Sequence, residues 1–416
     1  MRRHGKSPPD AANSATVTAK RMAIALLLLS EVAAMATWFA TTASIGAIRT
    51  HWTLSPFQEA LLTNSVQAGF VAGTLVSALL GLADRFDLRR LFCGCAVAAG
   101  LANLLMLAFE PTSPAVPLLR FITGACMAGV YPVGMKIAAT WAVGDLGLLI
   151  GLLVGALTLG SALPHLVAAF GQLDWHLPVL GAALGALLAA ALIRFVQLGP
   201  LRSEAPPLRL ENALEAWRNR GVRLANLGYL GHMWELYAMW AWIGAFMAAS
   251  FRERYGNAPP FPPELAAFAV VAAGAFGAML GGWAADRLGR TLVTGASMLA
   301  SGCCAIAVGF LFGGPAWAVL AVGVLWGVAV IADSAQFSAA VSELSDPRLI
   351  GTMLTVQTCV GFLLTLVSIQ LIAFAGTYLG WRFAFALLAV GPFLGLASML
   401  RLRRLPEAKR LAGGRK

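Results

Sequence analysis

The stretch GLADRFDLRR at residues 81–90 follows a long apolar run and has a partial copy, GGWAADRLGR, at residues 281–290. Both copies contain Asp-Arg followed by a further arginine. Asp84 and Asp286 are 202 residues apart, which is close to half of the 416-residue chain. A charged segment repeated at this distance predicts that the chain uses one structural unit twice.

A second repeat has nearly the same offset. EVAAMATW at residues 31–38 and ELYAMWAW at residues 235–242 both begin with a glutamate and share Ala, Met and Trp neighbours. Each glutamate lies deep inside an apolar run, where an isolated carboxylate costs at least about 3 kcal/mol. Glu31 and Glu235 therefore each need a partner, a proton or contact with water.

The composition of the chain places it in a membrane. Hydrophobic residues make up 59% of the sequence and charged residues only 12%, with a mean hydropathy of +0.77. Apolar runs of about 20 residues can cross a hydrocarbon core about 30 Å thick. We predict an all-α membrane protein whose twelve transmembrane helices form two six-helix bundles. The predicted helix cores are 22–47, 57–81, 90–109, 115–140, 146–170, 175–197, 223–250, 263–284, 291–312, 316–340, 349–375 and 380–400.

The repeat offset and the charged segment between the sixth and seventh runs predict how the chain is divided. The halves should be similar bundles joined on one side of the membrane. The predicted parts are a cytoplasmic N-terminal tail at 1–21, an N-terminal six-helix bundle at 22–197, a cytoplasmic linker at 198–222, a C-terminal six-helix bundle at 223–400 and a basic cytoplasmic tail at 401–416.

The positive charges predict the orientation of the chain. The net charge is +11, and most of the 30 Lys and Arg residues fall in the two tails and in alternate loops. By the positive-inside rule both termini are cytoplasmic, in a multi-pass protein of the cell inner (plasma) membrane. No cluster of basic and aromatic residues exists outside the spans, so we expect no nucleic-acid partner.

Twelve spans in a 6+6 repeat, with an Asp-Arg-x-Gly-Arg type of loop after the second helix of each half, resemble the major facilitator superfamily of secondary transporters. The resemblance covers essentially the whole chain. The second loop keeps Gly282 and Gly289 of the family pattern, whereas the first has Leu80 and Asp87 at these places. The resemblance implies alternating access by rocking of the two bundles.

The repeated loops are predicted to form a conformational latch. An Asp at a helix end can cap a neighbouring helix and pair with an Arg across the cytoplasmic surface. Such a contact would stabilise one conformation and release in another. Alternatively, these charges only set the topology. The predicted latch residues are Asp84, Arg85, Arg89, Asp286, Arg287, Gly289 and Arg290.

Two further spans bear on the family resemblance. Arg120 and Gly124 in the fourth span are similar to a family pattern of an Arg with a Gly four residues later. Antiporters of the family usually have a Gly-Pro pair in the fifth span, where this chain has Gly155-Ala156. This departure weakens efflux by antiport without excluding it. The span's glycines can equally serve close helix packing.

The two repeated glutamates are predicted to share a site. Residues offset by three, four and seven positions lie on one helix face. Two stripes result, Glu31, Ala34, Met35 and Trp38 in the first span and Glu235, Ala238, Met239 and Trp242 in the seventh. In the family these helices line the central cavity, so the resemblance implies two carboxylates facing one site. They could couple transport to protons, bind a cationic substrate beside the Trp faces, or pair structurally with Arg120 or His232.

The fourth span contains two basic residues and a predicted bend. Arg120 could bind an anionic substrate, toggle with Glu31, or reach the outer interface. Lys136 lies near the inner end of the span, and we expect it to extend to that interface. The proline in Tyr131-Pro132 should bend the helix just before Lys136.

Further polar side chains recur at helical spacing within the spans. They could line the substrate cavity or form ordinary hydrogen bonds between helices. His165 titrates in a useful range and is a second proton carrier to consider. The candidates are Asn64, Gln67, Tyr131, His165, Asp333 and Gln336, with Asp333 the third acidic residue deep within a span.

We predict a secondary transporter of a small organic solute or ion, coupled to protons and working as a monomer in the bilayer. A membrane-embedded enzyme would need a nucleophile and base or a metal cluster, and the five histidines are scattered. We therefore expect no catalytic residues, metal or cofactor. No phosphate-binding loop for ATP occurs. A non-transporting sensor, anion uptake or exchange through Arg120, and efflux by antiport remain alternatives.

Overall fold

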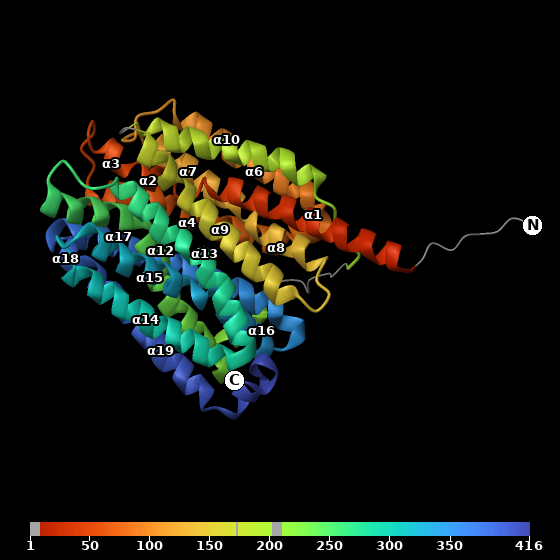
Figure 1. Ribbon diagram of the computed structural model, residues 1–416. Coiled ribbons are helices and arrows are strands. Elements are labelled where there is room, and N and C mark those ends of the chain that lie inside the picture. Colours follow the sequence, from red (N-terminus) through yellow and green to blue (C-terminus); the bar gives the residue numbers. More distant parts are fainter. Residues whose placement is uncertain (1–8, 172–173, 202–209) are drawn as a thin grey trace, which may run out of the picture.

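The protein is all-helical throughout the part that the structure describes. The computed structural model describes residues 9–171, 174–201 and 210–416, and these contain helices and no strand (Figure 1). The first eight residues of the predicted N-terminal tail and residues 202–209 of the predicted linker lie outside the described residues. The first helix begins at Pro9, so the inner part of the predicted tail is helical.

The first half of the chain contains ten α-helices. They are α1 (Pro9–Met35), α2 (Ala40–Ala43), α3 (Ile45–Ile48), α4 (Pro56–Leu80), α5 (Leu82–Arg85), α6 (Leu88–Met106), α7 (Ala115–Met127), α8 (Tyr131–Ala139), α9 (Leu146–Phe170) and α10 (His176–Leu192), followed by the short 3-10 helix η1 (Ile193–Phe195). Three of them, α2, α3 and α5, are single turns of four residues. The long ones cover the first six predicted spans.

The second half contains nine α-helices. They are α11 (Glu215–Arg218), α12 (Arg220–Tyr255), α13 (Pro263–Leu288), α14 (Arg290–Phe310), α15 (Ala316–Ala332), α16 (Ser334–Leu344), α17 (Ile350–Tyr378), α18 (Trp381–Ala384) and α19 (Val390–Arg403). Four 3-10 helices accompany them, η2 (Leu210–Asn212), η3 (Pro347–Leu349), η4 (Phe385–Ala389) and η5 (Pro406–Gly414). The long helices cover the other six predicted spans.

Nine helical segments of the described residues are long and apolar enough to cross a membrane. They are Leu88–Met106, Ala115–Ala139, Leu146–Phe170, His176–Phe195, Pro263–Leu288, Arg290–Phe310, Ala316–Leu344, Pro347–Tyr378 and Trp381–Arg403. The other three predicted spans correspond to α1, α4 and α12, which are helical but carry polar side chains in their middle. These three helices supply much of the candidate site.

Sequence signals for helix starts agree with the structure. α4 begins at Pro56 after Ser55, whose hydroxyl accepts a hydrogen bond from the Gln58 amide at 3.3 Å, while the Gln58 side chain accepts one from the Ser55 amide at 2.9 Å. This reciprocal pair satisfies amides that a helix start leaves free. α13 begins in the same way at a proline, Pro263.

The first predicted span is not one continuous helix. α1 ends at Met35, and α2 and α3 follow after a turn at residues 36–39. The predicted stripe that placed Trp38 on the same face as Glu31 was therefore wrong, since Trp38 lies beyond the helix end. Its counterpart in the second half, α12, continues without a break to Tyr255.

The fourth long helix is interrupted in both halves. α7 ends at Met127 and α8 begins at Tyr131, which confirms the bend predicted from Tyr131-Pro132. In the second half α15 ends and α16 begins on either side of Asp333. Because proline lacks an amide hydrogen, it fits the first turn of α8, where the amide would have no partner within the helix.

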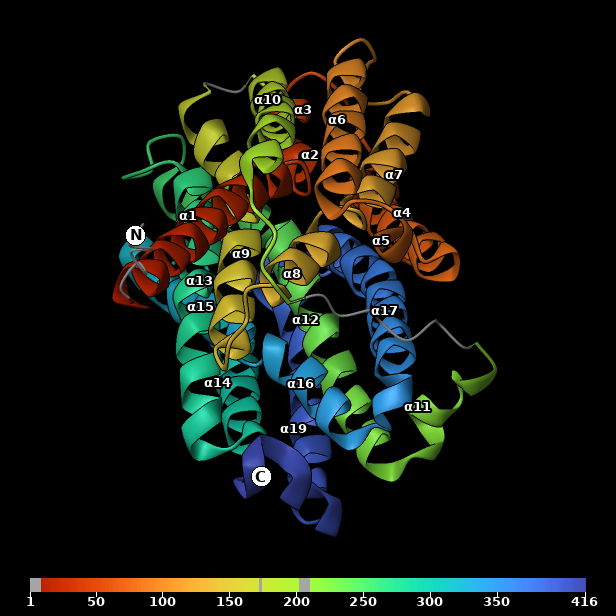
Figure 2. The same ribbon diagram turned by 90° about the vertical axis from the view of Figure 1, so that its right-hand side faces the viewer.

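The halves meet along two pairs of helices, α4 with α17 and α9 with α13. Seen from the end in Figure 2, these pairs lie on opposite sides, with α8, α12 and α16 between them. A Cβ atom at Gly155 of α9 would lie 3.7 Å from the Ala275 carbonyl oxygen of α13. This is an ordinary contact distance, so the two helices pack against each other here without requiring a glycine.

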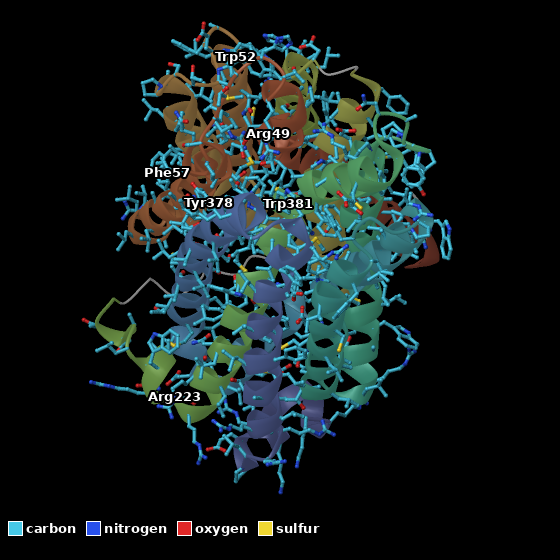
Figure 3. All side chains as sticks on the ribbon, turned by 90° about the vertical axis from the view of Figure 1, so that its left-hand side faces the viewer. Arg49, Trp52, Phe57, Arg223, Tyr378 and Trp381 are labelled. Atoms are coloured by element: carbon cyan, nitrogen blue, oxygen red, sulfur yellow. The ribbon has the colours of Figure 1, made fainter. Side chains whose placement is uncertain are left out.

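Polar contacts join the halves where α4 begins and α17 ends. The Asn64 amide donates to the Leu366 carbonyl at 3.1 Å, and the Gln370 amide to the Pro56 carbonyl at 3.5 Å. Figure 3 views this end of the molecule and labels Phe57 of α4 and Tyr378 of α17. The two halves are therefore closed against each other at this end.

Candidate functional site

Glu31 is a buried carboxyl group without a partner. Its side chain lies in the last third of α1 with no exposed surface, and neither oxygen has a hydrogen-bond partner among the described residues. It faces α8, where a Cβ atom added at Gly134 would collide with Glu31 Oε1. The missing side chain at Gly134 thus makes the space that the carboxyl group fills. Tyr131, one turn earlier in α8, is close enough to interact electrostatically with Glu31.

Glu235 is equally buried but has two donors. Ser301 Oγ of α14 donates to Oε2 at 2.6 Å, and Trp326 Nε1 of α15 donates to Oε1 at 2.7 Å. These helices belong to the same half as Glu235. The expected common site for both carboxylates is therefore not seen, because Glu235 is held inside the second half by its own neighbours.

The sequence explains why Glu31 lacks such donors. At the 202-residue offset of the repeated loops, Ala99 corresponds to Ser301 and Gly124 to Trp326. Neither has a side-chain donor. The repeat thus conserves the position of the carboxyl group and changes what surrounds it.

Arg120 binds backbone carbonyls rather than a carboxylate. Its fully buried guanidinium donates to the carbonyls of Thr37 at 2.7 Å, Trp38 at 2.5 Å and Leu62 at 3.2 Å, and to Asn103 Oδ1 at 3.3 Å. The expectations that it pairs with Glu31 or reaches the outer interface are not met in this structure. Carbonyl groups at a helix end have no amide donor from the next turn. The Arg120 guanidinium donates to such carbonyl groups in the turn after α1.

His232 pairs with Asp333 and not with Glu235, for which it was a candidate partner. His232 Nδ1 lies 2.8 Å from Asp333 Oδ1, and both side chains are almost completely buried. The other ring nitrogen, Nε2, has no hydrogen-bond partner in the described part of the chain. Asp333 sits at the break between α15 and α16, so this pair joins α12 to an interrupted helix.

Many of the predicted cavity residues share one property, a buried polar atom with no partner among the described residues. Such atoms are rare in proteins, because burying one without a hydrogen bond costs about 1–3 kcal/mol. Water or a bound solute would satisfy them. The unpartnered atoms of predicted residues are both Glu31 carboxyl oxygens, both Gln67 side-chain polar atoms, Asn64 Oδ1, Trp38 Nε1, His165 Nε2 and His232 Nε2. Trp240 Nε1 is also unpartnered, and the sequence did not predict this residue.

An aromatic cluster closes the centre between the halves. The Trp38 ring lies 5.0 Å from Phe70 of the first half, and 5.9 and 5.8 Å from Tyr237 and Phe362 of the second. Phe70 and Phe362 are themselves 4.6 Å apart. Sequence reasoning found only Trp38. Tyr237 was visible within the repeated ELYAMWAW stretch, but nothing in the sequence paired Phe70 with Phe362.

Four other predicted lining residues are either fully buried or already engaged by the protein. Met35 and Met239 are completely buried. Trp242 Nε1 donates to the Ile369 carbonyl at 2.9 Å, so its indole is engaged with α17. Gln336 accepts from Arg290 at 2.7 Å and so belongs to the loop network of the second half.

The first predicted latch loop makes its contacts within its own half. Asp84 forms an ion pair with Lys136 of α8, and Lys136 also donates to the Ala83 carbonyl at 3.0 Å. Lys136 thus extends toward the loop, as expected of a cation near a helix end. Asp87 caps α6 by accepting from the Arg89 and Arg90 amides. A hydrogen bond from the Arg89 side chain is the main factor that lowers the pKa of Asp87.

The second predicted latch loop also bonds within its half. Arg290 binds Glu343 of α16 at 2.6 and 2.9 Å and lies 3.9 Å from Asp286. Arg287 stacks over Trp283, with its guanidinium carbon 4.0 Å from the ring centre. Gly289 has φ +96, a conformation that favours glycine. No ion pair between the two halves occurs among residues 9–171, 174–201 and 210–416.

Metal binding finds no support in the described residues, which contain no group of three His, Cys, Asp or Glu side chains suited to one ion. The site is instead a buried, polar and aromatic centre between two helical halves.

The sequence profile of the Major Facilitator Superfamily matches residues 27–261, more than half of the chain. The chain belongs to the major facilitator superfamily. It is a multi-pass membrane transporter and not an enzyme.

A solved structure supports the fold of this superfamily member. A crystal structure of a mutant of the nucleoside transporter NupG superposes with a TM-score of 0.70. The match covers 92% of this chain and 99% of that one at 13% sequence identity. Such low identity supports the shared fold alone. A comparison with curated proteins finds no match.

Proposed function

We propose that this transporter moves a small polar organic solute by alternating access, driven by a proton gradient that acts through Glu31. The observation that carries the proposal is the complete burial of the Glu31 carboxyl group without a hydrogen-bond partner among the described residues. A charged carboxylate in that place is costly, and binding a proton removes the cost. Proton loading and release at Glu31 would then favour different arrangements of α1 and α8.

The unpartnered polar atoms support a solute with both hydrogen-bonding groups and a ring. Gln67 offers an amide donor and acceptor, and Trp38 and Trp240 offer indole donors beside aromatic faces. Aromatic pairs of this kind prefer tilted or edge contacts with other rings. Nucleosides are included among the solutes to test because the structural neighbour NupG transports them and because they combine a ring with hydroxyl groups.

An anionic solute held by Arg120 has less support. Four of its guanidinium hydrogen bonds already go to three carbonyls and Asn103. A cation bound directly by Glu31 is the second candidate, because the unpartnered carboxyl group would serve a cation as well as a proton. Efflux by antiport and uptake by symport both fit the arrangement.

The remaining sequence predictions stay part of the proposal. We infer twelve spans in two six-helix bundles, both termini in the cytoplasm of a cell with an inner membrane, and a monomer. The repeated loops around Asp84 and Asp286 are proposed to act as a latch between the halves. Asp84 bonds within its own half here, whereas Asp286 Oδ2 lies beside the start of α9, 3.7 Å from where a Cβ atom at Gly147 would be. His165, with an unpartnered Nε2, is proposed as a second proton carrier.

The test is transport by the purified full chain in liposomes. A pH gradient is imposed, solutes are screened by uptake, and substrate-dependent proton flux is recorded. For a transported solute, Glu31→Gln should abolish accumulation driven by the gradient and spare exchange of solute across the membrane, because Gln cannot release a proton. Unchanged accumulation would contradict proton coupling. If accumulation persists while affinity for a cationic solute falls, Glu31 binds the solute instead.

A further inference from the structure

A basic pocket lies on the side of the first half, away from the candidate site. It has a volume of about 500 Å³ and is lined by Asp87, Arg89, Arg90, Cys93, Gly94 and Arg194. The first five lie at the start of α6, and Arg194 is in η1, directly after α10. α6 and α10 pack side by side (Figure 1). We propose that this pocket binds the phosphate headgroup of an anionic phospholipid.

The charges of the pocket favour an anion. Three arginines face one aspartate, and that aspartate is occupied by Arg89 at 3.1 Å and by two backbone amides of α6. Arg90 and Arg194 are exposed and form no ion pair within the described residues. Two free guanidinium groups can bind phosphate oxygens in the bidentate geometry that arginine favours.

The position of the pocket favours a lipid over a soluble anion. It lies where two candidate membrane spans, Leu88–Met106 and His176–Phe195, have their ends, which is the depth of a lipid headgroup. Gly94 leaves open space, since a Cβ atom there would meet nothing within 4 Å. Exposed leucines lie on the same two helices, on α10 in the half nearer the pocket and on α6 in the half remote from it. They are Leu101 and Leu105 of α6 and Leu184 and Leu188 of α10, each more than half exposed.

The second half arranges its charges differently at the equivalent place. At the 202-residue offset, Leu292 corresponds to Arg90 and Leu396 to Arg194. A requirement of the repeated fold would place the same charges in both halves. The second half has arginines of its own there, but Arg290 pairs with Glu343 and Arg403 donates to Thr291 at 3.0 Å. Exposed arginines without an ion pair among the described residues, Arg90 and Arg194, are therefore particular to the pocket of the first half.

Native mass spectrometry of the detergent-solubilised full chain tests the proposal. Phosphatidylglycerol or phosphatidylcholine is added at equal concentration, and bound lipid is counted. The wild type should retain one phosphatidylglycerol, and Arg90→Gln combined with Arg194→Gln should lower its occupancy by at least about tenfold. A matched control combines Arg348→Gln with Arg401→Gln, two exposed arginines outside the pocket, and should bind as the wild type does.

Three outcomes would overturn the site. The control variant could lose as much lipid as the pocket variant, the wild type could bind both lipids equally, or inorganic phosphate could displace the lipid at similar concentration. The last result would assign the pocket to a soluble anion. Thermal unfolding of both variants checks that they are folded, and because all four arginines are exposed, their unfolding temperatures should stay near that of the wild type.

Discussion

The two halves of the chain bury a glutamate at equivalent places and treat it differently. Glu235 receives hydrogen bonds from Ser301 and Trp326, whereas Glu31 lies against Gly134 and receives none from the described residues. Repetition therefore preserved the helix and its carboxyl group but not its surroundings. An internal repeat can retain one copy of a group as part of the packing and leave the other free to change its protonation state.

Exchange of each glutamate for glutamine is the strongest test of this difference. Glu31→Gln should lower gradient-driven accumulation by at least about tenfold. Gln cannot bind and release a proton, so the variant loses the link between proton movement and solute movement. Glu235→Gln should leave accumulation within about threefold of the wild type and mainly reduce stability. Transport in liposomes gives the comparison. Equal loss in both variants would show that the carboxylates act as a pair.

The space at Gly134 offers a second way to break the comparison. In Gly134→Ala the new methyl group would occupy the place of Glu31 Oε1, so the carboxyl group or α8 must move. Transport should fall by about fivefold or more, a smaller effect than loss of the carboxyl group itself, by analogy with overpacking in a core. Gly181→Ala is the control, since its Cβ atom would meet Val167 at an ordinary 3.8 Å. Equal activity of both variants would contradict a tight contact at Gly134.

Removing a donor should make the second half resemble the first. Ser301→Ala takes away the 2.6 Å hydrogen bond to Glu235 and leaves a buried carboxylate with one donor, Trp326. We expect a loss of about 1–3 kcal/mol in the free energy of unfolding. Thermal unfolding in detergent measures it. Ser398→Ala, at a half-buried serine whose hydroxyl donates to the Leu394 carbonyl of its own helix, should have little effect and serves as the control.

The smallest expected effect concerns the helix that follows each repeated loop. α6 is capped by Asp87, whereas α14 has Gly289 at the equivalent place and no side-chain cap. Asp87→Ala should cost about 1 kcal/mol of stability. The hydrogen bond from Arg89 holds the pKa of Asp87 below its ordinary value, so this stabilisation is present above about pH 4 and is lost as the pH falls through the lower, folded-state pKa.

Unfolding as a function of pH checks the Asp87 prediction. The difference between wild type and Asp87→Ala should be constant from neutral pH to about pH 4 and shrink below it. A difference that grows with acidity would mean that the protonated side chain is the better cap.

The sequence predicted the fold well because the fold depends on long-range regularities. Apolar runs of spanning length indicated a helical membrane protein, and the family comparison agrees. The offset between Asp84 and Asp286 indicated a repeat, and the division into two six-helix bundles stays a prediction. The proline of Tyr131-Pro132 marked the break before α8. Local chemistry alone is enough for such signals, since proline fixes its own backbone angle and lacks an amide hydrogen.

The site was harder to predict because it depends on which side chains meet across helices. The sequence singled out Glu31, Glu235 and Arg120 as buried charges, and all three are buried. It could not tell that Ser301 and Trp326 would supply donors to one glutamate, or that Arg120 would bind the carbonyls after α1. These partners come from helices far apart in sequence, and no pattern within one helix specifies them.

The bonds of Arg120 have a consequence for observing the transporter at work. They tie the backbone of Trp38 to the first half, while the indole ring lies 5.9 Å from Tyr237 and 5.8 Å from Phe362 in the second. Trp38 is thus a natural fluorophore anchored to one moving body and in contact with the other. Separation of the halves at this point would change the polarity around its ring. Because the chain has 12 tryptophans, the difference in emission between the wild type and Trp38→Phe would report this separation without an added label.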